Sequence, residues 1–245
     1  MKKIIITTLC MSVFIHVLIA QTDPKETEYY TPVPPKVTPG IGTAPPSDAV
    51  ILFDGKNMDQ WITSSDKSAS KWILNTQEGS MTVPKGLGGI ETKRYFGSCQ
   101  LHIEWRTPNP PHGEGQDCGN SGVFLQSKYE VQVLDNYTNK TYTNGQAGSI
   151  YKQTAPLVNA SLKPGEWQTY DIIWNAPKFD IEGRLTKPAD ITVLHNGILV
   201  QNHWVLTGNT PYIGQPKYEA HGVLPLALQD HSHPVSYRNI WIREL

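Results

Sequence analysis

Two polar side chains alternate with valines in the segment Tyr129–Asp135. Strict alternation places Glu130 and Gln132 on one face of a strand and Val131 and Val133 on the opposite face. If the valine face packs on an apolar core, the other face presents a carboxylate and an amide, the groups from which a sugar-binding cleft is built. An ordinary antiparallel sheet with one solvated face gives the same pattern. The interpretation therefore depends on the other strands.

Three further predicted strands carry ionisable or amide side chains at alternate positions. These side chains are Glu104 in 101–106, Gln229 and His231 in 223–231, and Arg238 in 235–241. If the strands are neighbours, we expect four ionisable groups to converge on one concave surface. The four are Glu104, Glu130, His231 and Arg238.

Six motifs follow one another with a specific order and spacing. They are Gly119–Leu125, Tyr129–Asp135, Gly165–Asp171, His195–Gly197, Leu228–His231 and Tyr237–Trp241. Together they resemble the 3-keto-disaccharide hydrolase domain, a family formerly catalogued as a domain of unknown function and described as secreted glycosyl hydrolases. The resemblance covers roughly residues 48 to 245 and extends to the opening Ala49–Lys56 with Trp61 after it. It implies a concanavalin A-like jelly roll, although a shared fold does not fix a reaction.

The resemblance also implies a substrate and a reaction. The substrate is a disaccharide or glycoside already oxidised to a ketone at C3, which acidifies the proton on C2. A base removes this proton, the enolate expels the C1 substituent, and later addition of water gives net hydrolysis. Such a site needs a base, a stabiliser for the enolate oxygen and an acid for the leaving group.

Roles for individual residues follow from strand faces and side-chain chemistry. We expect Glu130 or His231 to be the base and Arg238 to stabilise the enolate. Glu104 is expected to be the acid or to support another catalytic group. The residues that suit recognition of sugar hydroxyls are Gln132, Gln229, Asn120 and Ser121.

No cofactor is firmly implied, and a divalent metal stays open. Asp117, Asp135 and Asp230 offer the oxygen ligands that calcium prefers, but they have no regular ligand spacing. His231 and His233 resemble a metal-binding pair, although alternate positions after a strand equally form a surface loop.

Two other functions compete with elimination. Conventional glycoside cleavage would use two carboxylates, Glu104 and Glu130. Glucanases of this sandwich type carry further acidic residues along the catalytic strand, whereas here the alternate positions read Glu130, Gln132 and Leu134, which argues against that mechanism. A noncatalytic carbohydrate-binding module would need only polar groups and tryptophans. Most of the tryptophans are expected in the core, and Trp204 is the least secure of these assignments.

The composition favours a single β domain. The chain has 245 residues with 20 Gly and 19 Pro, and such punctuation between short apolar runs is typical of two stacked antiparallel sheets rather than helices. Asn196-Gly197 predicts a type I′ hairpin turn. The expected strands are 49–53, 71–75, 80–83, 89–92, 99–106, 121–126, 129–134, 148–151, 167–174, 190–195, 198–205, 223–230 and 236–243.

Three regions are expected along the chain. Residues 1–20 have a basic start, an apolar run and a small residue at the end, which predicts a cleaved signal peptide and a periplasmic or secreted protein. The apolar run is too short and interrupted to predict a membrane span. Residues 21–47 form a proline-rich arm, either a spacer or a strap along the sandwich. Residues 48–245 form the β-sandwich domain.

Charge and cysteines add two expectations. The net charge of −1 gives no indication of nucleic acid as a partner, and the sequence leaves the oligomeric state open. Cys99 and Cys118 remain after removal of the leader. They either pair across a hairpin in an oxidising compartment or stay as two buried thiols.

Overall fold

In the computed structural model of the protein, residues 23–245 are described. The chain divides into two units, the first ending at Lys36 and the second running from Val37 to Leu245. The first unit contains the short 3-10 helix η1 (Pro24–Thr27). The expected signal peptide, residues 1–20, lies outside the described residues. No helix formed by the described residues has the length and apolar character needed to cross a membrane.

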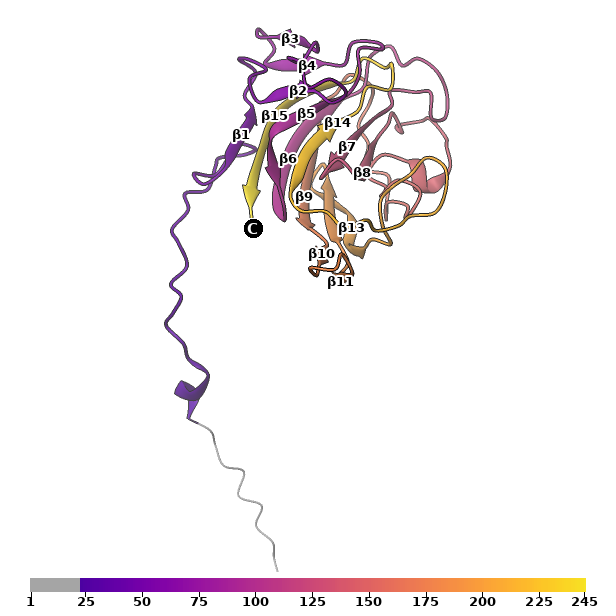
Figure 1. Cartoon of the computed structure of the whole chain (residues 1–245). Helices are drawn as coiled ribbons and strands as arrows, with labels where there is room; N and C mark the ends of the chain where they lie inside the picture. The colour runs from indigo at the N-terminus through magenta and orange to yellow at the C-terminus, as the bar shows by residue number, and fades with distance from the viewer. Residues whose placement is uncertain (1–22) are drawn as a thin grey trace, which may run out of the picture. The chain divides into compact units, whose positions relative to one another are not determined.

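The larger sheet of the second unit has eight strands (Figure 1). Seven follow the order β13-β12-β9-β6-β15-β4-β3, and β1 pairs with β15. The strands are β1 (Val50–Phe53), β3 (Ile73–Asn75), β4 (Ser80–Thr82), β6 (Cys99–Arg106), β9 (Gln168–Asn175), β12 (Asp190–His195), β13 (Ile198–Val205) and β15 (Ser236–Glu244).

The smaller sheet has five strands in the order β2-β5-β14-β7-β8, again antiparallel. They are β2 (Trp61–Thr63), β5 (Ile90–Phe96), β7 (Ser121–Leu125), β8 (Tyr129–Val133) and β14 (Leu224–Leu228). A separate hairpin joins β10 (Lys178–Phe179) to β11 (Leu185–Lys187), and the 3-10 helix η2 (Thr143–Gly145) follows β8.

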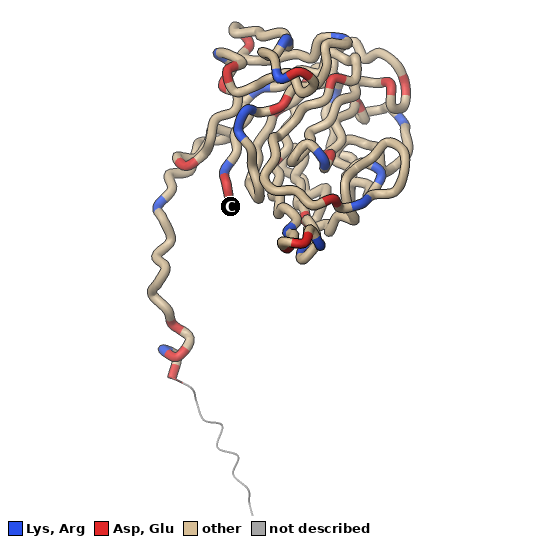
Figure 2. Tube along the Cα trace, in the orientation of Figure 1, with Lys and Arg blue, Asp and Glu red and all other residues tan. Residues whose placement is uncertain are grey.

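Alternation along the strands fills the space between the two sheets. Leu101, Ile103 and Trp105 of β6 face the same core as Val123 of β7 and Val131 of β8, so the intervening side chains of each strand point out of the sandwich. The expected all-β, two-sheet antiparallel fold is confirmed, and it is a concanavalin A-like jelly-roll sandwich. Charged residues of both signs are interspersed along the trace rather than gathered by sign (Figure 2).

Most expected strands are present, and the differences involve short pieces. Residues 148–151 do not form a strand, since Ile150 makes only isolated bridges to Val131 and Thr154. The strands β2, β10 and β11 were not expected because two or three residues are too few for a recognisable alternation. Asn196 and Gly197 both have positive φ values, 53° and 76°, as the expected tight turn requires.

The expected alternative of a Cys99–Cys118 disulfide is wrong, because both cysteines are free and buried. Cys99 begins β6, whereas Cys118 immediately precedes Gly119, which lies against Thr107 beyond the other end of that strand. Eight residues of β-strand extend more than about 20 Å, far beyond the reach of a disulfide.

Candidate active site

A cavity of about 280 Å³ lies on the outer face of the five-stranded sheet. Five of the residues expected at the site line this cavity, namely Asn120, Glu130, Gln132, Gln229 and His231. The lining residues are Gln116, Asn120, Phe124, Glu130, Gln132, Tyr151, Thr210, Tyr212, Gln229 and His231.

The Glu130 carboxyl is the main ionisable group of this inner cavity. The residue is 4% exposed, and its side chain makes no hydrogen bond or ion pair with any described residue. Burial therefore raises the pKa of Glu130 to about 8. The backbone is held on both sides, since Glu130 N donates to Thr210 Oγ1 (3.0 Å) and Glu130 O accepts from Tyr151 N (3.2 Å). A carboxyl with this pKa can accept or donate a proton near neutral pH.

Gly122 leaves room for the Glu130 side chain. It lies on β7 next to Phe124, the cross-strand partner of Glu130 on β8. A Cβ atom at position 122 would overlap Glu130 Oε1 and come within 2.7 Å of the Phe124 ring. The backbone of Gly122 does not have a positive φ, so space for the carboxyl, rather than backbone conformation, requires glycine here.

Side-chain amides surround the Glu130 carboxyl, and they differ in how many hydrogen-bond partners they have within the protein. Gln132 Nε2 donates to Gln116 Oε1 and Asn120 Oδ1, both at 3.3 Å, and Asn120 Nδ2 donates to Gln116 O at 2.7 Å. Gln229 is different, because its buried Oε1 has no partner and its Nε2 bonds to no described residue. Gln229 therefore offers both an acceptor and a donor to a bound molecule.

A second cavity of about 400 Å³ adjoins the first and shares Gln116, Asn120, Tyr151, Tyr212 and His231 with it. The residues that line only this outer cavity are Asp117, Tyr142 and Lys152. His231 therefore stands between the two spaces.

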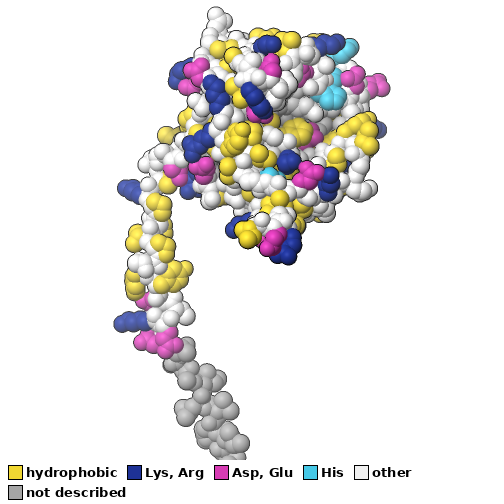
Figure 3. Space-filling view, in the orientation of Figure 1, with side chains coloured by type: hydrophobic (Ala, Val, Ile, Leu, Met, Phe, Trp, Pro, Cys, Tyr) yellow, Lys and Arg dark blue, Asp and Glu magenta, His cyan; other side chains and the backbone are white. Residues whose placement is uncertain are grey.

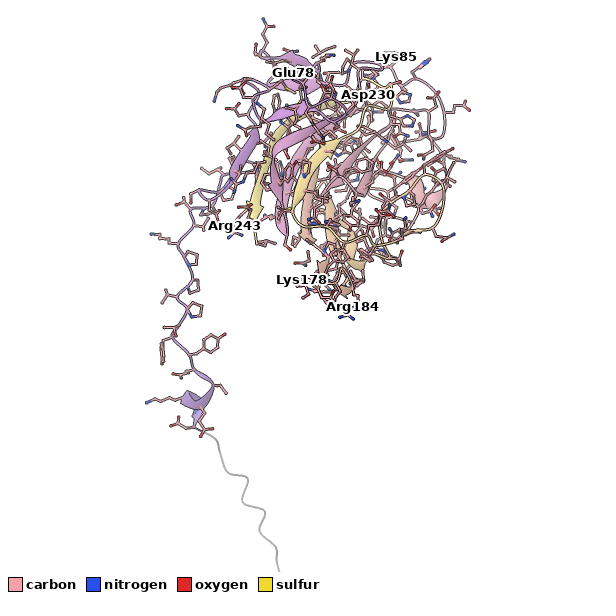
Figure 4. All side chains as sticks on the ribbon, viewed as in Figure 1. Glu78, Lys85, Lys178, Arg184, Asp230 and Arg243 are labelled. Carbon is pink, nitrogen blue, oxygen red and sulfur yellow. The ribbon has the colours of Figure 1, made fainter. Side chains whose placement is uncertain are left out.

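His231 belongs to a small group of histidines at this end of the fold. Its ring stacks on that of His233, with centroids 5.7 Å apart, and His233 Nε2 lies 3.0 Å from Asp117 Oδ1. Figure 3 shows histidine side chains (cyan) gathered toward the upper right of the face in view. Asp230, labelled in Figure 4, lies at the opposite end of the sandwich from Lys178 and Arg184 of the β10–β11 hairpin.

Glu104 and Arg238 do not join this site, and the expectation that four ionisable groups converge is wrong. They are cross-strand partners on β6 and β15 of the eight-stranded sheet, and they point away from the core on its outer face. The core therefore separates them from Glu130. Arg238 Nε donates to Glu104 Oε2 at 2.6 Å.

The surroundings of Glu104 satisfy its charge. Burial alone would raise the pKa of Glu104, but the nearby His102 ring and hydrogen bonds from Asn239 and Arg238 lower it to about 2. Burial alone would likewise lower the pKa of His102, but its contacts with Asp171 and Glu104 raise it to about 9. Paired charges of this kind stabilise the ionised forms of both partners.

The expectation that Ser121 recognises sugar hydroxyls is also wrong. It points into the core between the sheets, where its Oγ donates to Gln229 O (2.6 Å) and accepts from Tyr237 Oη (2.7 Å). Ser121 therefore links the two sheets and holds the Gln229 backbone, but it is not available to a ligand.

A larger cavity, about 590 Å³, lies elsewhere, between residues 37–46 and the outer face of the eight-stranded sheet. The segment 37–46 is attached there through Thr43, whose Oγ1 donates to Glu104 Oε1 and whose carbonyl accepts from Trp241 Nε1. Because the ionisable groups beside this cavity are paired, we place the candidate active site at Glu130 instead.

Loops supply the lining residues that the sequence did not reveal. Tyr151 and Lys152 follow η2, and Thr210 and Tyr212 lie in the long connection between β13 and β14, which passes η2 in Figure 1. These residues have no alternation to place them. Among residues 23–245, no three His, Cys, Asp or Glu side chains are grouped as a metal site requires.

A two-sheet sandwich with a polar cleft on one outer sheet face is the arrangement expected of a sugar-binding protein. Residues 48–243 match the model of the 3-keto-alpha-glucoside-1,2-lyase-like domain, and the chain belongs to this family. It is a carbohydrate-active enzyme domain whose substrate is a sugar. No curated protein is significantly similar to it.

Solved structures from one bacterium share the fold. A proposed glycosyl hydrolase from Parabacteroides distasonis ATCC 8503 is 49% identical, with a TM-score of 0.86 over 92% of this chain and 98% of that chain. Two more proposed glycosyl hydrolases from the same organism are more distant. One is 18% identical (TM-score 0.60, 81% of this chain and 94% of that chain), and the other is 21% identical (TM-score 0.55, 80% and 99%).

Proposed function

We propose that the protein cleaves 3-keto-glycosides by elimination, followed by addition of water. The observation that carries this proposal is the Glu130 carboxyl, which is buried, has no charged partner and has a pKa of about 8. A base of this strength matches the removal of a proton made acidic by a neighbouring ketone. The family match and the 49% identical neighbour support the same class of activity.

The reaction begins at C2 of the ketone-bearing ring. Ionised Glu130 takes the C2 proton, and the electron pair of that bond forms the enolate of the C3 ketone. The amide of Gln229, which has no other partner, donates a hydrogen bond to the enolate oxygen. When the enolate collapses, the C1–oxygen bond breaks and the leaving oxygen takes a proton.

His231 suits delivery of that last proton. It lies where the inner and outer cavities meet, and an imidazole can carry a proton and donate it to a leaving oxygen. Water then adds to C1, and a proton returns to C2, so that the net reaction is hydrolysis. Gln132 and Asn120 are already tied to Gln116 and hold a fixed arrangement toward the sugar hydroxyls.

Conventional two-carboxylate hydrolysis lacks the pair of residues expected for it. That mechanism needs two carboxyl groups roughly 5 to 9.5 Å apart. Glu104 and Glu130 lie on the outer faces of different sheets, and stacked sheets alone are about 10 Å apart. A noncatalytic binding module gives no reason for a buried carboxyl without a partner, because such a group costs folding stability.

The test compares a simple glucoside with its 3-keto derivative while release of the aglycone is followed. We expect turnover of the 3-keto compound only. Replacement of Glu130 by Gln keeps the shape and should lower the rate by about a hundredfold or more. Equal or faster cleavage of the unoxidised glucoside would contradict elimination, and inactivity toward both would favour a binding module.

A further inference from the structure

The two adjoining cavities of the active-site cleft differ in their spare hydrogen-bonding capacity. In the inner cavity, the Glu130 carboxyl and the Gln229 amide have no partner among the described residues. A sugar ring, which carries several hydroxyl groups, can satisfy such groups. The inner cavity therefore suits the reacting sugar, and its neighbour must hold whatever is attached at C1.

Several of the polar groups that line the outer cavity are already hydrogen-bonded within the protein. The hydroxyls of Tyr142 and Tyr151 lie 2.8 Å apart, and Lys152 Nζ donates to Tyr212 O at 2.6 Å. Gln116 Nε2 donates to Thr141 Oγ1 and Gly145 O. A second sugar in this space would find these groups occupied and would depend on Asp117 and His231 for hydrogen bonds to its hydroxyls.

Aromatic rings form the wall of the outer cavity instead. Lys152 Nζ lies 4.3 Å from the centroid of the Tyr212 ring, 5.6 Å from Tyr151 and 6.0 Å from Tyr142. These distances are those of cation–π contacts, which hold the three rings around one ammonium group. Tyr212 is 71% exposed, so a large part of its surface is free to stack on a ligand.

We infer that the outer cavity is an aglycone subsite for a planar aromatic group, which makes aryl 3-keto-glucosides the preferred substrates over disaccharides. The inference rests on the proposed function, because it assigns the leaving group to the space beside His231. A flat ring gains from stacking on tyrosines without needing hydrogen bonds. A pyranose ring also stacks on aromatic side chains, but it brings hydroxyls that this wall does not satisfy.

The test measures binding separately from chemistry. The Glu130→Gln variant is titrated calorimetrically with phenyl 3-keto-glucoside and with the 3-keto derivative of a glucosyl-glucose disaccharide of the same anomeric configuration. We expect the phenyl compound to bind on the order of tenfold more tightly. Adding Tyr212→Ala should remove most of this preference, whereas Tyr95→Ala, an exposed tyrosine that lines neither cavity, should keep it.

Turnover supplies a second measurement. The different leaving-group abilities of phenol and methanol affect wild type and variant equally, so they cancel when the ratio of kcat/KM is compared between the two proteins. The ratio of kcat/KM for phenyl over methyl 3-keto-glucoside should fall on the order of tenfold in Tyr212→Ala, and Tyr95→Ala should retain the wild-type ratio. Equal or tighter binding of the disaccharide, no binding of either compound, or a preference that survives Tyr212→Ala overturns the inference. Selective binding without turnover would overturn the proposed reaction and leave the aromatic subsite standing.

Discussion

At the scale of single residues, Glu130 departs most from what folding alone favours. A carboxyl removed from water without a charged or hydrogen-bonding partner destabilises the folded state whenever it is ionised. Glu104 has the opposite environment, since Arg238, Asn239 and Thr43 all bond to it. Perturbed carboxyls of the first kind gather at functional sites. The contrast between the two glutamates is why the site belongs to the five-stranded sheet.

The raised pKa of Glu130 predicts a pH-dependent effect on stability. Between the unfolded pKa near 4.5 and the folded pKa of about 8, the unfolded chain loses the Glu130 proton and the folded chain keeps it. Unfolding is therefore favoured increasingly as pH rises through this window. Relative to wild type, Glu130→Gln should gain stability from pH 4.5 to pH 8, by up to about 1.4 kcal/mol per pH unit.

Denaturant unfolding of both proteins across this pH range measures the difference. Other titrating groups cancel between the two proteins, so the difference isolates residue 130. A constant difference from pH 4.5 to pH 8 would mean that the carboxyl is ionised normally in the folded protein, and the proposed base would lose its physical support.

Gly122 gives a second prediction at this scale. Gly122→Ala should push the Glu130 carboxyl and the Phe124 ring out of place, and we expect kcat/KM to fall by at least about tenfold, because small displacements of a catalytic group are costly. Gly97→Ala is the matched control, since its added methyl group would meet only Val223 at an ordinary 3.6 Å. If both variants keep wild-type activity, the carboxyl does not need the space that Gly122 leaves.

At the scale of strands, the alternation of polar and apolar residues predicts which face of a strand a side chain occupies. It does not predict which of the two sheets the strand joins. It placed Glu130 and Gln132 away from the core correctly, because Val131 and Val133 are buried in it. It also placed Glu104 away from the core correctly. The failure was the assumption of a shared surface, since pairing between distant strands decides which sheet a strand joins. Here β6 pairs with β15 and β9, whereas β8 pairs with β7.

The core tryptophans provide the prediction for strands. Trp105 on β6 is fully buried between the sheets, whereas Trp204 on the edge strand β13 is 38% exposed. Trp105→Ala should lower the free energy of unfolding by roughly 3 to 5 kcal/mol. Trp204→Ala, which leaves a smaller cavity, should cost clearly less. Urea unfolding compares the two, and equal losses would contradict the assigned burial.

At the scale of the whole molecule, the cleft is formed by loops around a rigid sheet. The six sequence motifs were enough to predict the sandwich, and they contain Asn120, Glu130, Gln132, Gln229 and His231 of the inner cavity, which lie on or beside regular strands. Tyr151, Lys152 and Tyr212 could not be predicted in the same way. They come from connections without periodicity, and their placement depends on tertiary contacts such as that of Lys152 with Tyr212 O.

The most direct test of elimination is the fate of the hydrogen on C2. In heavy water, cleavage of a 3-keto-glucoside should give a sugar product that carries solvent deuterium at C2, or one that has no hydrogen there if it is released before water adds. The free 3-keto sugar, incubated in the same way, controls for exchange after cleavage. Mass spectrometry or NMR measures the product. Release of the aglycone with the original C2 hydrogen retained would contradict proton removal by Glu130 and the mechanism built on it.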